Sequence, residues 1–308
     1  MPEPALTRSL HLLAHLLTAL LLPPLLPGLI AKVKAAFAGR QGAPVLQLYY
    51  DLGKLARKRA RFSRTTTWVF LAGPAAVAAA GLGAALLVPF GHTPAPVHFE
   101  GDLVLFAYLF GAARFATVLS ALDTGSSFEG MGAAREVTFA VLAEPALFLG
   151  FAALAKASGS LSLSGLLATS GPALSRATAP LILVLAGWAI VYLAENARIP
   201  VDDPTTHLEL TMIHEVMVLD HSGRPLALAQ YGASLKLLVL GALIVGPLLP
   251  RTGSALLDWG AFALATLLLA AGVGVVESCT ARLRLDRVPQ FLMAGLLASA
   301  FAFFLVQG

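Results

Sequence analysis

Charged side chains interrupt stretches of this sequence that are otherwise apolar. An ionisable group at the centre of a bilayer costs on the order of 2.5 to 3.5 kcal/mol on insertion scales, so it is retained where it pairs or serves a function. Acidic groups on several helices are typical of a proton relay, and the alternative is a set of structural ion pairs that fixes helix register. The residues in such positions are Arg114, Glu136, Glu144, Glu195, Lys236 and Glu277. We expect Arg114 to pair with Glu144 or Glu136.

The composition indicates that these groups lie in a membrane protein. Of the 308 residues, 57% are hydrophobic and 12% are charged, whereas soluble domains contain about 25% charged residues. This composition excludes an ordinary cytosolic enzyme. Apolar runs predict an all-α, polytopic single membrane domain over residues 1–308, with about eight transmembrane helices. The predicted spans are about Leu10 to Val33, Trp68 to Pro89, Leu103 to Leu122, Arg135 to Ala155, Leu181 to Glu195, Leu226 to Leu248, Ala255 to Glu277 and Val288 to Val306.

Lysine and arginine are distributed unevenly between the connections. The connections after the first and seventh spans are rich in them, whereas those of the other parity hold Lys156, Arg176 and Arg251. By the positive-inside rule, both termini face away from the cytoplasm. Membrane orientation therefore explains the net charge of +4, and we expect no nucleic-acid partner.

Two of the predicted cytoplasmic segments have a pattern of their own. Residues 39–64 combine apolar positions at helical spacing, from Val45 to Leu55, with basic residues on another face, which predicts an amphipathic helix in the membrane interface. Residues 195–225 form an acidic loop, in which we expect a short helix over 205–219. A loop of this charge density is typical of a docking surface or an ion entrance.

The sequence offers little for catalysis by this chain alone. The single cysteine, Cys279, cannot supply the thiolates of an iron–sulfur cluster. His207, His214 and His221 recur at intervals of seven, but Ser222 and Gly223 should break the helix, and the zinc-protease spacing is absent. We expect no cofactor, metal site or catalytic residue on this chain, and no activity from the chain by itself.

Several motifs carry a family resemblance over essentially the whole length. They are Gly39 to Gln47 leading into Tyr50-Asp51-Leu52, Leu122 to Ser126, Gly132 to Glu136 with Glu144-Pro145, Glu195 to Asp202, Asp220 to Gly223, and Ala281 to Asp286. With them the chain resembles subunit 1 of respiratory complex I, and more closely the formate hydrogenlyase subunit 4 (hydrogenase-4 component C) family of group 4 nickel–iron hydrogenases.

The resemblance implies a non-redox subunit of an oxidoreductase complex in the prokaryotic cytoplasmic (inner) membrane. Such a subunit anchors a peripheral redox arm of iron–sulfur and hydrogenase-like large and small subunits, and it starts an acidic path toward antiporter-like membrane subunits. Iron–sulfur clusters and a nickel–iron site are then expected on the partners. The polar lining and relay implied by the matching motifs are Arg40, Asp51, Arg135, Glu136, Glu144, Glu195, Arg198, Asp202 and Glu209.

Two departures from the family pattern bear on function. Only Gly42 to Val45 separate Arg40 and Gln41 from Leu46, and this short stretch favours the hydrogenase branch over a quinone-site subunit of an NADH:quinone oxidoreductase. The acidic cluster after Asp202 has fewer carboxylates than the family's, so we hypothesise that His207 carries protons there, since the ordinary pKa of histidine is about 6.5. The favoured alternative is that His207 caps or hydrogen-bonds a docking surface. An independent transporter is a third alternative.

Overall fold

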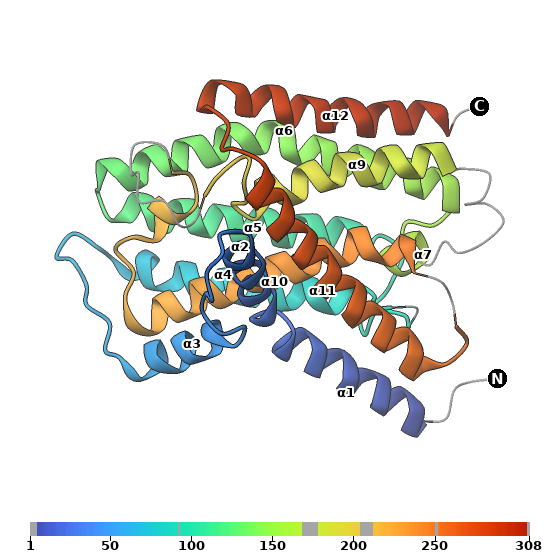
Figure 1. Cartoon of the computed structure of the whole chain (residues 1–308), viewed down its shortest axis with the longest axis horizontal. Helices are drawn as coiled ribbons and strands as arrows, with labels where there is room; N and C mark the ends of the chain where they lie inside the picture. Colours follow the sequence, from blue (N-terminus) through green and yellow to red (C-terminus); the bar gives the residue numbers. More distant parts are fainter. Residues whose placement is uncertain (1–4, 92, 168–177, 204–211, 250–251, 307–308) are drawn as a thin grey trace.

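The computed structural model is built of helices connected by short loops (Figure 1). It describes residues 5–91, 93–167, 178–203, 212–249 and 252–306, and no strand occurs within these ranges. The α-helices are α1 (Ala5–Leu21), α2 (Leu25–Phe37), α3 (Gln47–Arg57), α4 (Trp68–Leu87), α5 (Asp102–Asp123), α6 (Ser127–Ser158), α7 (Leu163–Leu167), α9 (Thr178–Glu195), α10 (Gly223–Val245), α11 (Ala255–Cys279) and α12 (Val288–Leu305). The short 3₁₀ helices are η1 (Glu215–Val218), η2 (Gly246–Leu248) and η3 (Leu285–Arg287).

The membrane spans agree with the predicted number when the bent first span is included. Seven helices in the described ranges are long and apolar enough to cross a bilayer, namely α4, α5, α6, α9, α10, α11 and α12. The first predicted span, about Leu10 to Val33, is wrong as a single helix: α1 and α2 meet at a bend of 46°. Pro23 and Pro24 occupy the break, where proline lacks the N–H that would continue the helix.

Two further expectations need correction. The fourth span begins at Ser127 rather than near Arg135, so α6 has 32 residues and is about 48 Å long, which exceeds a hydrocarbon core of about 30 Å. The helix expected over 205–219 is, where the structure describes it, the single 3₁₀ turn η1. Residues 204–211, with His207 and Glu209, lie outside the described part of the chain.

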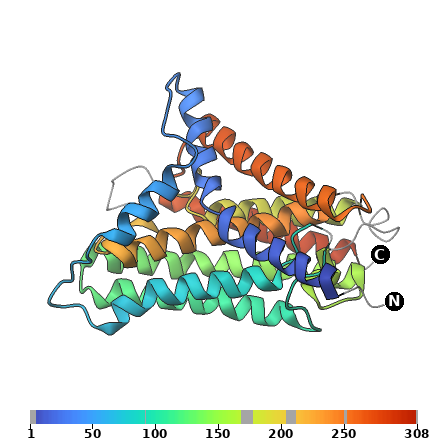
Figure 2. The ribbon, with the colours of Figure 1, turned by 90° about the horizontal axis from the view of Figure 1, so that it is seen from below.

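Helix α10 forms the centre of the bundle. Its residues from Leu237 to Val245 are all buried, and it contacts α2, α3, α4, α9 and α11. Outside it, α4 pairs with α5, and α6, α9 and α12 pack together, while α11 crosses beside α2 (Figures 1 and 2). The side chains of this part of α10 therefore face other helices rather than lipid.

The bundle has two distinct ends. Ala5 and Val306 lie at one end, and α3 lies at the other, as an even number of spans requires (Figure 1). We call the latter the α3 end. Helix α3 is amphipathic and has no fully buried residue, which agrees with the predicted helix at the membrane interface.

Close packing of α9 and α12 depends on glycine. A Cβ atom on Gly187 would lie 2.8 Å from the carbonyl oxygen of Gly295, and backbone cannot move aside as a flexible side chain can. The small residues allow the two helices to approach, as is common where helices pack in membranes.

We therefore expect Gly187→Val to lower the melting temperature of the detergent-solubilised protein by several degrees, because α9 and α12 must separate. Gly260→Val on α11 is the matched control, since a Cβ there meets no atom within 4 Å. Equal melting temperatures for the two variants would show that this contact does not limit stability.

Candidate functional site

The guanidinium of Arg114 joins three carboxylates from two other helices. Arg114 Nε lies 3.0 Å from Glu136 Oε1, and its Nη2 lies 2.5 Å from Glu195 Oε1. Its Nη1 contacts Glu144. The pairing expected from the sequence is therefore confirmed for both Glu136 and Glu144, and Glu195 is an additional partner. Because α5 supplies the arginine and α6 and α9 the acids, the cluster links three membrane-spanning helices.

His214 extends this cluster toward the α3 end. Its Nε2 lies 2.9 Å from Glu136 Oε2, and its Nδ1 lies 3.8 Å from Asp202 Oδ2. Asp202 also accepts hydrogen bonds from the backbone N–H groups of Ile213 and His214 and pairs with Arg282 at 2.9 Å. Burial disfavours the imidazolium, but the carboxylates of Glu136 and Asp202 outweigh it and raise the pKa of His214 to about 9.

Lys236 closes the series on the central helix. Its Nζ lies 2.6 Å from Glu195 Oε2, so the fully buried middle of α10 begins next to a charged group. The ion pairs thus run without interruption from Arg282 through Asp202, His214, Glu136, Arg114 and Glu195 to Lys236, with Glu144 as a branch. We call these residues the ion-pair chain.

The net charge of the ion-pair chain depends on whether His214 is protonated. Four carboxylates face three permanent cations, Arg114, Lys236 and Arg282. Within the described residues, the ion-pair chain is therefore neutral when His214 is protonated and carries one negative charge when His214 is neutral. Buried charge is costly, so loss of the proton from His214 favours uptake of a proton by a neighbouring carboxylate.

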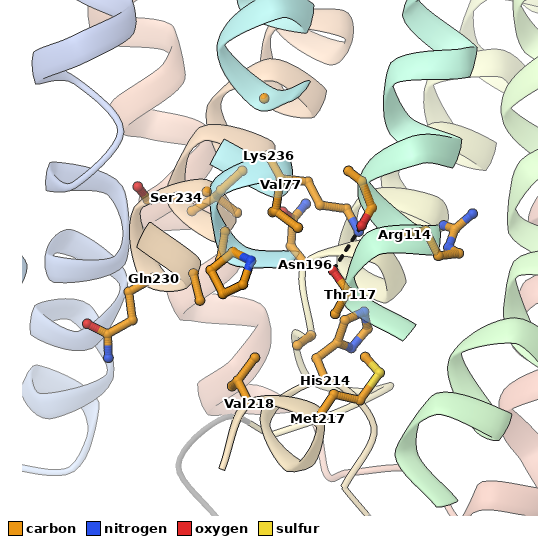
Figure 3. Close-up of a pocket in the computed structure, with 18 of the residues that line it drawn as sticks. Val77, Arg114, Thr117, Asn196, His214, Met217, Val218, Gln230, Ser234 and Lys236 are labelled. Carbon is orange, nitrogen blue, oxygen red and sulfur yellow. Dashed lines mark hydrogen bonds between the residues drawn. The ribbon is translucent and has the colours of Figure 1, made fainter. Parts of the chain in front are cut away.

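A cavity of about 330 Å³ borders the ion-pair chain. Figure 3 shows His214, Asn196 and Lys236 around it, with Gln230 on the opposite side. Apolar residues of several helices make up most of the remaining lining, among them Val77 of α4 and Leu237 of α10. The cavity is therefore mostly apolar, with polar groups concentrated at the ion-pair chain.

A second group of charges ties α2 and α11 to the turn after α9. Glu277, whose side chain is fully buried, lies 2.8 Å from Lys34 Nζ and 3.6 Å from Arg198 Nη1. Arg198 also lines the cavity. Glu277 is thus near the site but outside the ion-pair chain.

Three predicted site residues take no part in this arrangement. Arg40 is exposed after α2, and Asp51 on α3 accepts a hydrogen bond from Gln47 Nε2 at 3.0 Å. Arg135 donates to the carbonyl oxygen of Met212 at 2.8 Å and so holds the loop that carries His214. None of the three lines the cavity.

Sequence reasoning missed the role of His214 and of Arg282. The signal for His214 was its position beside Glu215 in an acidic loop, but nothing in the sequence indicated that it contacts Glu136. In the described residues, no group of three His, Cys, Asp or Glu side chains is placed to hold a metal ion. What the geometry provides is a series of ionisable side chains in direct contact.

Comparisons with known proteins agree with this architecture. The family model described as NADH dehydrogenase matches residues 10–308. Formate hydrogenlyase subunit 4 of Escherichia coli (strain K12) is 33% identical over 286 residues, which cover 90% of this chain and 91% of that protein. Hydrogenase-4 component C of the same organism is 33% identical and covers 72% of this chain and 70% of its own length.

More distant similarities extend the comparison. An NADH-quinone oxidoreductase subunit from Rubrobacter xylanophilus is 25% identical, over 79% of this chain and 76% of that protein. A chain in the structure of the membrane-bound sulfane sulfur reductase, an archaeal respiratory membrane complex, superposes with a TM-score of 0.83 at 19% identity and covers 97% of this chain and 99% of its own. This integral membrane protein therefore belongs to the NADH dehydrogenase family, of the complex I subunit 1 type, together with the formate hydrogenlyase and hydrogenase-4 membrane subunits.

Proposed function

We propose that this chain is the membrane-anchoring and proton-coupling subunit of a complex of the group 4 nickel–iron hydrogenase type. It docks the peripheral redox arm at the α3 end, which faces the cytoplasm, and links it to antiporter-like membrane subunits. The names of its relatives, a formate hydrogenlyase subunit and a hydrogenase-4 component, support the type of complex.

The observation that carries the coupling role is the uninterrupted ion-pair chain. It starts at Asp202 in the loop after α9 and reaches Glu144 in the middle of α6. Register alone would be fixed by one or two pairs, whereas here a single arginine serves three carboxylates. In this proposal the proton held by His214 passes to Glu136 over 2.9 Å, which changes the charge beside Arg114 and leaves His214 free to take up another proton.

The docking role follows from the position of the loop after α9. This loop, η1 and α3 lie at the same end of the bundle, where the ion-pair chain begins (Figure 1). A peripheral arm docked there would change its own charge during redox turnover, close to Asp202 and His214. His207, the proton carrier that we hypothesised from the sequence, lies outside the described residues, and His214 fills that role in this proposal.

A quinone-site subunit is the second candidate function. The cavity favours it, because a mostly apolar lining with a cluster of polar groups suits a molecule with a polar ring and a long apolar tail. The similarity to a subunit of an NADH-quinone oxidoreductase at 25% identity points the same way. The sequence identity to the hydrogenase subunits, 33%, is higher than this value and supports the first proposal.

Purification of this chain from its native membrane in mild detergent separates the two functions. We expect it to copurify with a hydrogenase-like large subunit and with nickel in equal amount to this chain, measured by mass spectrometry and metal analysis. A nickel-free complex that contains extractable quinone would overturn the hydrogenase proposal and support the second function.

Neutralising the ion-pair chain should uncouple the complex. Positioned proton-transfer groups typically contribute about 10² to 10⁴ in rate, so we expect Glu136→Gln and Glu195→Gln to reduce redox-driven proton translocation in membrane vesicles by at least about tenfold. Redox turnover with an artificial electron donor should persist, because these residues do not hold a redox centre.

The matched control is Glu129→Gln, which removes a buried carboxylate from the same helix as Glu136 but outside the ion-pair chain. It should keep the coupling of the wild type. Normal proton translocation by both Glu136→Gln and Glu195→Gln would rule out the relay.

The ion pairs of His214 should stabilise the protein in a pH-dependent way. Its pKa in the folded state, about 9, exceeds the ordinary value of 6.5, so the stabilisation is complete below about pH 6.5 and is lost as the pH rises through about 9. His214→Gln should therefore lower the melting temperature by several degrees at pH 6 and have little further effect above pH 9.

Thermal unfolding of the purified complex across this pH range checks the expectation. His98→Gln is the control, because His98 is exposed at the opposite end of the bundle and donates a hydrogen bond from Nδ1 to the carbonyl oxygen of Ala95. A melting-temperature difference for His214→Gln that stays constant with pH would contradict a protonated, paired His214.

A further inference from the structure

Glu144 is exposed where a membrane protein should not expose a carboxylate. Its side chain is 47% accessible, whereas those of Glu136 and Glu195 are 8% and 10% accessible. At 1.5 Å per residue it lies about 25 Å from Ser127 and about 20 Å from Ser158, the two ends of α6. Either distance places it deep within the hydrocarbon layer.

The carboxylate borders an open groove between α5 and α6. A cavity of about 650 Å³ lies there, and its lining includes both Arg114 and Glu144. Its remaining lining on α5 and α6 includes small residues, Ala107, Gly111, Ala112 and Ala143. A Cβ built on Gly111 meets no atom within 4 Å, so this part of the groove is empty rather than filled by the chain's own side chains.

Exposed apolar side chains flank the groove on both sides. Tyr108 and Phe115, which line the groove on α5, are 73% and 64% exposed. On α6, Phe148 lines it and is 43% exposed, and Val141, one turn before Glu144, is 67% exposed. These positions follow one face of each helix. The two helices lie on the side of the bundle opposite α2 and α11 (Figure 2), so the groove is remote from the second group of charges around Glu277.

Lipid cannot supply the hydrogen-bond donor that the carboxylate in this groove requires. Acyl chains carry no hydrogen-bond donor, and an unsatisfied ionised group in hydrocarbon is costly. Arg114 contributes only part of the compensation, because it also serves Glu136 and Glu195. The lipid-facing sides of α11 and α12 differ in this respect: their most exposed residues, such as Leu256 and Phe304, are apolar.

We propose that the α5–α6 groove is the seat of a transmembrane helix from a partner subunit, which presents small residues to Gly111 and a hydrogen-bond-donating side chain to Glu144. Small residues on both sides allow close helix approach, and a polar contact across the interface stabilises it. Glu144 is then the point where the ion-pair chain leaves this subunit, a role that rests on the proposed function.

Site-specific photocrosslinking in the native membrane tests the docking surface directly. A benzoylphenylalanine residue is introduced at Phe115 or at Val141, with Leu264 on α11 and Phe301 on α12 as controls of similar exposure. We expect both groove positions to crosslink to the same membrane-spanning segment of one partner subunit, identified by mass spectrometry. The controls should yield lipid adducts.

Filling the groove provides a second, independent measurement. Gly111→Leu adds a side chain where this chain has no atoms to displace, so the fold should be retained while the partner helix is excluded. The amount of that partner recovered with this chain should fall severalfold, and Gly260→Leu on α11 should leave it unchanged.

The outcomes separate docking from coupling. Lipid adducts alone at both groove positions, or crosslinks between two copies of this chain, would overturn the docking proposal even if Glu136→Gln and Glu195→Gln abolish proton translocation. Conversely, crosslinks to a partner helix together with normal proton translocation by those two variants would establish the docking surface and reject the relay.

Discussion

The sharing of one guanidinium among three carboxylates determines much of this structure. Arg114 on α5 faces Glu136 and Glu144 on α6 and Glu195 on α9. None of these four groups is tolerable alone in a hydrocarbon environment, so each constrains the positions of the other helices. Helix α5 packs mainly against α4 and makes far fewer contacts with α6. The open groove lies beside the ion pairs and is lined by both Arg114 and Glu144.

The charge balance of the site depends on a residue at one of its ends. His214 enters from the loop rather than from a membrane helix. The neighbouring carboxylates raise its pKa to about 9, so it is protonated at neutral pH and its proton balances the charge of the ion-pair chain. In the proposed function, the charge at the α3 end, where the peripheral arm would dock, influences the charge in the membrane interior. Glu195 would carry that influence farther, because it contacts Arg114 at 2.5 Å and Lys236 at 2.6 Å.

Much of the fold could be predicted from the sequence, because the length and spacing of apolar runs report directly on membrane spans. The break in the first span was not predicted: Pro23 and Pro24 occur in an apolar run whose hydropathy does not reveal a bend. The pairing of Arg114 was predictable because an unpaired intramembrane arginine is so unfavourable. The participation of His214 was not, since it depends on the fold of the loop after α9 and on Arg135, which holds Met212 by a hydrogen bond to its carbonyl.

The bend between α1 and α2 has a consequence for the backbone of the first span. Pro23 and Pro24 have no N–H to offer the carbonyl oxygens of Ala19 and Leu20, and the N–H of Leu25 turns to Leu22 instead of Leu21. Tyrosine hydroxyls replace the missing donors: Tyr231 on α10 lies 3.5 Å from the Ala19 oxygen and 3.2 Å from that of Leu20, and Tyr49 on α3 donates to Leu21. At the break, the carbonyl oxygens of Ala19, Leu20 and Leu21 thus receive hydrogen bonds from the central helix and the interfacial helix, and loss of either phenol would leave backbone acceptors unpaired in the hydrocarbon layer.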